Sequence, residues 1–89
     1  MTERIGVMLA DAGTDFVLFI GTWCPYCDRA KRMLDANSLT WTDYNIDDED
    51  WLRGEVVAMT GHRTVPVIFD MRGDGHVFVG GSDDLQRYL

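Results

Sequence analysis

The chain has 89 residues, of which 46% are hydrophobic and 26% are charged, so its composition predicts one globular domain over residues 1–89. Its net charge of −7 argues against nucleic-acid binding, because nucleic acids are bound through basic surfaces. No stretch is long or apolar enough to cross a membrane, and residues 1–10 lack the apolar core of a secretory signal. The acidic excess comes mainly from aspartate, and it fits either a general solubility feature or a high-salt habitat.

Helices and strands alternate in the first half of the chain. Residues 2–12 show helical spacing of apolar side chains, with Thr2 as the expected cap. Residues 16–20 form a continuous apolar run, which is typical of a central strand buried on both faces. An amphipathic helix is expected over 25–37, and the alternation of apolar and polar residues in 41–46 predicts a second strand.

The second half predicts a helix, a hairpin and a final helix. The acidic segment after the second strand leads into a helix that ends near residue 60. Strands are expected over 65–70 and 76–79, joined by a glycine-rich turn, and Ser82 is expected to cap the last helix. The first two strands should be parallel and the last two antiparallel. The sequence therefore predicts an α/β fold with a four-stranded mixed sheet flanked by helices.

The only two cysteines form the motif Cys24-Pro25-Tyr26-Cys27, directly after the first predicted strand. A residue before proline is kept out of the helical region, so Cys24 is expected at the N-cap and Pro25 at the first helical position. Unpaired amides and the helix dipole favour a thiolate at the cap. A free thiol titrates near pH ~8.5, whereas thiols at such sites reach about 3.5–7.5. Cys24 is therefore the expected attacking thiolate and Cys27 the resolving thiol.

Two other interpretations of the cysteines remain open from the residues alone. A structural zinc site would need four ligands, and the chain offers only Cys24, Cys27, His62 and His76, with no second close pair. The cysteines could also be inert core thiols, although Pro25 at a helix start argues against that. We expect no metal. A catalytic pair suits a reducing compartment, so we expect the protein in the cytoplasm.

Three blocks in order give the chain a resemblance to the dithiol glutaredoxins. They are Trp23-Cys24-Pro25-Tyr26-Cys27, Arg63-Thr64-Val65-Pro66 and Gly80-Gly81-Ser82-Asp83-Asp84-Leu85. The resemblance implies the thioredoxin fold, with Pro66 in the cis form beside the active disulfide. It also implies that glutathione, or a related small thiol, is the co-substrate, and that no cofactor is permanently bound.

The same resemblance implies a set of glutathione-binding residues. The backbone of Val65 would meet the cysteine moiety of glutathione, and Asp83 would pair with its γ-glutamyl ammonium group. The implied contacts are Tyr26, Arg63, Thr64, Val65, Pro66, Gly81, Ser82 and Asp83. Many members carry a lysine where this chain has Gly21. Arg63 is the expected replacement cation, while Lys31 and Arg29 are expected to lie farther away.

The function that follows is that of a thiol–disulfide oxidoreductase acting on protein disulfides and mixed disulfides. We expect a monomer whose partners are glutathione and disulfide-containing proteins, with ribonucleotide reductase as one possible substrate. Two alternatives remain. The protein could be an electron donor recharged by a thioredoxin-reductase-type flavoprotein, or a non-enzymatic iron–sulfur carrier in which Cys24 is a cluster ligand.

Overall fold

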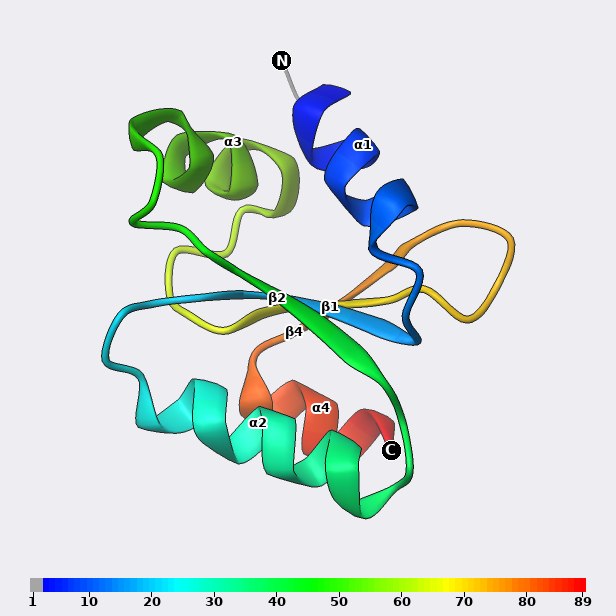
Figure 1. The fold of residues 1–89 in the computed structure, drawn as a ribbon. Coiled ribbons are helices and arrows are strands. Elements are labelled where there is room, and N and C mark those ends of the chain that lie inside the picture. Colours follow the sequence, from blue (N-terminus) through cyan, green and yellow to red (C-terminus); the bar gives the residue numbers. More distant parts are fainter. Residues whose placement is uncertain (1–2) are drawn as a thin grey trace.

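A computed structural model describes residues 3–89 and contains one mixed sheet with the strand order β2-β1-β3-β4. Helices lie on both faces of this sheet (Figure 1). In chain order the elements are α1 (Glu3–Ala12), β1 (Phe16–Ile20), α2 (Pro25–Ala36), β2 (Trp41–Asn45), α3 (Asp50–Thr60), β3 (Val67–Asp70), β4 (Val77–Gly80) and α4 (Ser82–Tyr88). The predicted order of elements is confirmed, whereas the expected cap Thr2 lies outside the described residues.

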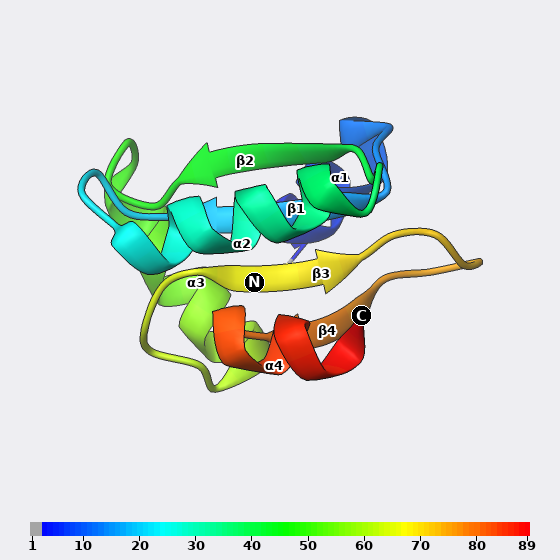
Figure 2. The same cartoon turned by 90° about the horizontal axis from the view of Figure 1, so that it is seen from below.

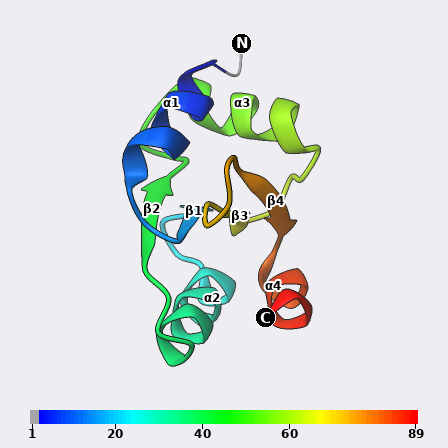
Figure 3. The ribbon, with the colours of Figure 1, turned by 90° about the vertical axis from the view of Figure 1, so that its right-hand side faces the viewer.

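Strand β1 lies in the middle of the sheet and is buried on both faces, as its apolar sequence predicts. It runs parallel to β2 and antiparallel to β3. Its side chains alternate between two cores: Val17 and Phe19 pack with α1 and α3, and Phe16 and Leu18 pack with α2 and α4. Figure 3 shows these two helix pairs on opposite sides of the sheet.

Three loops meet at one end of the sheet because of the strand directions. Strands β1 and β4 run the same way, and β3 runs between them in the opposite direction. Three points therefore lie at the same end of the sheet, at the left of Figure 2: the end of β1, the start of β3 and the end of β4. Each of these three points carries one of the sequence blocks singled out above.

Some boundaries differ from those predicted. Strand β3 begins at Val67, two residues later than predicted, because Pro66 has no N–H to donate to a strand ladder. The Val65–Pro66 peptide is cis, as the resemblance implies. Helix α4 is capped by Gly81 and not by Ser82. The Gly81 N–H donates to Asp84 Oδ2 at 2.9 Å, while the Ser82 hydroxyl accepts a hydrogen bond from Arg29.

Gly80 makes the sharp entry into α4 possible. Its φ of 122° lies in a region that side chains avoid, and an added Cβ would lie 2.3 Å from Asp84 Oδ2. None of the described helices is long and apolar enough to span a lipid bilayer.

Candidate active site

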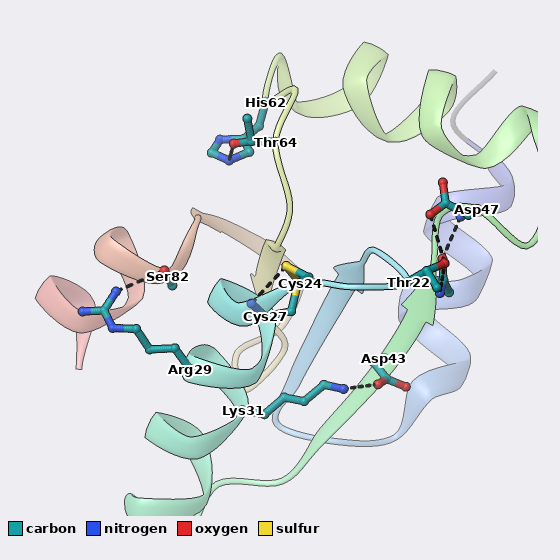
Figure 4. The surroundings of a disulfide bond; sticks show 11 residues. Thr22, Cys24, Cys27, Arg29, Lys31, Asp43, Asp47, His62, Thr64 and Ser82 are labelled. Carbon is teal, nitrogen blue, oxygen red and sulfur yellow. Dashed lines mark hydrogen bonds and ion pairs between the residues drawn. A yellow bond between two sulfur atoms is a disulfide. The ribbon is translucent and has the colours of Figure 1, made fainter.

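The cysteine turn has the geometry that its sequence predicts. Cys24 is the N-cap of α2, with an extended backbone, and Pro25 opens the helix. The Cys27 N–H donates to Cys24 Sγ at 3.1 Å. The two cysteines form a disulfide, with their Cα atoms 5.2 Å apart. Figure 4 shows this disulfide between Thr22 on one side and Ser82 on the other.

The two cysteines differ in their exposure to solvent. Cys27 lies in the first turn of α2 and is 2% exposed, whereas Cys24 is partly exposed at the helix start. The neighbouring aromatic side chains project outward: Trp23 is 87% exposed and Tyr26 is 63% exposed. A substrate that approaches this end of the sheet therefore reaches Cys24 first.

A pocket of about 370 Å³ lies at this end of the sheet. It is lined by Tyr26, His62, Thr64, Val65, Pro66, Gly81, Ser82, Asp83 and Asp84. The structure thus brings together every predicted ligand contact except Arg63, which is exposed and outside this lining. Two lining residues were missed, His62 and Asp84. His62 directly precedes the block that begins at Arg63, and Asp84 lies inside the last block without having been singled out as a contact.

His62 forms one wall of the pocket. Its Nε2 lies 3.2 Å from Thr64 Oγ1, and its ring packs edge-on against Phe78. The imidazole lies close to the start of α4, because a Cβ added at Gly81 would lie 3.5 Å from His62 Nε2, in ordinary van der Waals contact. His62 thus places a polar side chain in the wall of the pocket, whereas Arg63 lies outside the lining.

The start of α4 carries two carboxylates with different environments. Asp84 turns back to the Gly81 N–H, and this hydrogen bond, together with the nearby Arg87, holds the pKa of Asp84 below its usual range. Asp83 is exposed, and its Oδ1 lies 2.7 Å from Arg29 Nη1. Asp84 therefore shapes the turn, while Asp83 faces outward at the pocket.

Arg29 contacts the start of α4, although it does not line the pocket. Its Nη1 donates to both Ser82 Oγ, at 3.1 Å, and Asp83 Oδ1, while the expectation that it lies too far away to replace the lysine missing at Gly21 stays a prediction. The sequence could not show this contact, because it depends on how α2 packs beside α4 (Figure 2). Lys31 instead pairs with Asp43 on β2, with an N–O distance of 2.6 Å.

Comparison with known proteins identifies the family to which this fold and site belong. A sequence model of the glutaredoxin family matches residues 16–81. A glutaredoxin from Pseudomonas aeruginosa is 38% identical over 69 residues, which cover 78% of this chain and 77% of that protein. Glutaredoxin 3 from Escherichia coli is 38% identical over 63 residues, covering 70% of each chain.

Solved structures agree with the sequence comparison. A buckwheat glutaredoxin–glutathione complex matches with a TM-score of 0.80 and 25% identity, covering 97% of this chain and 76% of that one. A dithiolic glutaredoxin from Trypanosoma brucei brucei matches with a TM-score of 0.74 and 35% identity, over 93% and 82% of the two chains.

The fold and the disulfide at the N-terminus of α2 define a thioredoxin-fold redox protein. More narrowly, the chain belongs to the glutaredoxin family, with the Cys-Pro-Tyr-Cys motif of its dithiol class. It is therefore a thiol–disulfide oxidoreductase, as its sequence predicts. The two alternatives, a flavoprotein-recharged donor and an iron–sulfur carrier, are not favoured.

Proposed function

We propose that the protein uses glutathione to reduce protein disulfides and glutathione–protein mixed disulfides, with no permanently bound cofactor. The observation that carries this proposal is the position of the accessible Cys24 beside the pocket lined by Tyr26, Val65 and Asp83. A small γ-glutamyl thiol held in that pocket would present its sulfur to Cys24. The similar buckwheat glutaredoxin, whose structure is a complex with glutathione, also supports this proposal.

The chemistry requires two successive thiol–disulfide exchanges. The Cys24 thiolate attacks the glutathione sulfur of a mixed disulfide, a Cys24–glutathione bond forms, and the protein thiolate leaves and takes up a proton. The thiolate of a second glutathione then attacks the glutathione sulfur, which releases glutathione disulfide and restores Cys24. The N–H of Cys27, which donates to Cys24 Sγ, stabilises negative charge on that sulfur in both steps.

Protein disulfides would follow a route that uses both cysteines. Attack by Cys24 joins it to one protein sulfur, and the Cys27 thiolate then attacks Cys24 and releases the reduced protein. The product is the Cys24–Cys27 disulfide present in the structure. Two glutathione molecules reduce that disulfide and are oxidised to glutathione disulfide.

A glutathione-coupled assay with two single variants tests the proposal. Cys24→Ser should abolish activity on every substrate, because the attacking sulfur is gone. Cys27→Ser should keep the removal of glutathione from a small mixed disulfide while losing the reduction of protein disulfides. Wild-type protein that turns over with dithiothreitol but shows no saturable use of glutathione would contradict the proposal.

We also infer that the protein acts as a monomer in the cytoplasm on disulfide-containing proteins. The disulfide spans only a sequence separation of 3, which suits catalysis in a reducing compartment better than structural stabilisation. Trp23, which is 87% exposed beside Cys24, offers an aromatic contact to a protein substrate such as ribonucleotide reductase. Size-exclusion chromatography tests the monomeric state. A coupled ribonucleotide reductase assay that compares Trp23→Ala with the wild type tests the contact with that substrate.

A further inference from the structure

Arg29 makes an unusually complete set of contacts with one short segment. It lies on α2, two residues after Cys27, and its guanidinium donates to Ser82, Asp83 and Gln86, all on α4. Its side chain is 34% exposed, and Ser82 is 5% exposed. The planar fork of a guanidinium holds several acceptors in a fixed relation to one another, which a flexible surface ion pair does not do.

The contact with Arg29 restricts the side chain of Asp83. Its side chain is 76% exposed, so without a partner its carboxylate would be free to sample several rotamers. Arg29 binds Oδ1, and among residues 3–89 we find no hydrogen bond to Oδ2. One oxygen is therefore held by the protein, and the other remains for a ligand in the pocket that Asp83 lines.

We propose that Arg29 is a positioning residue for the γ-glutamyl end of glutathione, an inference that rests on the function proposed above. Arg29 fixes the Asp83 carboxylate so that its free oxygen meets the ligand ammonium without a further loss of side-chain entropy. Fixing a binding group in advance increases affinity by removing such an ordering cost from the binding step. Arg29 contacts Ser82 and Asp83 and acts on the ligand only through them.

The chain provides a matched control for the charge of Arg29. Arg32 is exposed on the same helix, one turn further on, so Arg29→Gln and Arg32→Gln change the net charge equally. Arg29→Gln should raise the KM for a glutathionylated substrate about five- to tenfold, with kcat changed less than twofold. Arg32→Gln should change the KM less than about twofold. Arg29→Lys, which keeps one charged donor, should recover part of the loss.

A double-mutant cycle separates positioning from a structural role. If Arg29 acts through Asp83, then Arg29→Gln should change the KM less than about twofold in an Asp83→Asn background. Additive effects of the two changes would overturn the proposal, as would equal effects of Arg29→Gln and Arg32→Gln.

The same assay distinguishes this inference from the proposed function. Wild-type protein that saturates with glutathione, together with an unchanged KM in Arg29→Gln, would overturn only the role of Arg29. Wild-type protein that fails to saturate with glutathione would overturn both.

Discussion

Cys24 and Cys27 are three positions apart, yet they meet different surroundings. Cys24 caps α2 and its sulfur accepts the Cys27 N–H, whereas Cys27 is 2% exposed inside the first turn. A helix start favours negative charge on the capping atom, so reduction should leave one accessible, thiolate-forming sulfur and one sheltered sulfur. The difference in reactivity arises at the level of single residues and does not require a third catalytic group.

Alkylation of the reduced protein tests this difference directly. Iodoacetamide at neutral pH should modify Cys24 at least ~10-fold faster than Cys27, because the thiolate is the reactive species and Cys24 is both capped and accessible. Peptide mapping by mass spectrometry measures the two rates. The Cys27→Ser variant serves as control and should keep the fast rate. Faster labelling of Cys27 would reverse the assigned roles.

His62 and Arg63 are adjacent, and the structure separates their expected contributions to ligand binding. His62 lines the pocket, whereas Arg63 is exposed outside the lining, although the sequence favoured Arg63. His62→Ala should raise the KM for glutathione about three- to tenfold, the loss expected for one polar contact of about 1 kcal/mol. Arg63→Ala should have a smaller effect. Steady-state kinetics measures the KM of both variants. A larger increase in Arg63→Ala than in His62→Ala would support the expectation from the sequence that Arg63 binds the ligand.

The elements also explain how much of the site could be predicted. Three sequence blocks were recognisable, and strand directions alone bring them to one end of the sheet. The contact between Arg29 and α4 could not be predicted, because periodicity gives the buried face of α2 but not which helix lies beside it. His62 was missed as a ligand contact for a related reason: its place in the pocket wall depends on the path of the loop that joins α3 to β3.

Strand β3 and helix α4 are joined at the end of the sheet opposite the active site. Asp70, at the end of β3, is 7% exposed and accepts hydrogen bonds from Arg72 and from the Tyr88 hydroxyl at 2.6 Å. The bond from Arg72 is the main cause that lowers the pKa of Asp70 from 3.8 to about 2, and burial opposes it. This cluster ties the C-terminal helix, which carries Ser82 and Asp83, to the sheet.

The lowered pKa predicts acid sensitivity with a defined sign. A carboxylate whose folded pKa is depressed stabilises the protein above its unfolded pKa, and that stabilisation is lost as pH falls from about 4 to about 2. The expected loss is about 2 kcal/mol of unfolding free energy. Asp70→Asn should remove this component, as measured by urea unfolding between pH 2 and 7.

Asp74 supplies the matched control, since it is an exposed aspartate in the neighbouring turn. Asp74→Asn should unfold with the same pH dependence as the wild type. If Asp70→Asn kept the full wild-type acid sensitivity, the cluster would not be its source.

The charge of the whole molecule acts on the site from a distance. The net charge is −7, and arginines that could offset it are paired with aspartates: Arg29 with Asp83, Arg53 with Asp47 and Arg87 with Asp84. These pairs leave little positive potential to attract an anionic ligand. A small anionic thiol should therefore meet a general repulsion that sums over many carboxylates.

Ionic strength should reveal this repulsion in catalysis. The Debye length falls from about 30 Å at 0.01 M to about 10 Å at 0.1 M. The radius of gyration is 11.8 Å, so low salt exposes glutathione to the charge of the entire molecule and moderate salt only to the nearer part. The kcat/KM for glutathione should rise about 1.5- to threefold over this range, because screening removes a sum of repulsions while weakening only a few attractive contacts. Reduction by uncharged dithiothreitol should stay constant over the same range. A kcat/KM for glutathione that falls steadily with salt would contradict this account, because it would show that local attractive contacts of the ligand outweigh the repulsion by the acidic surface.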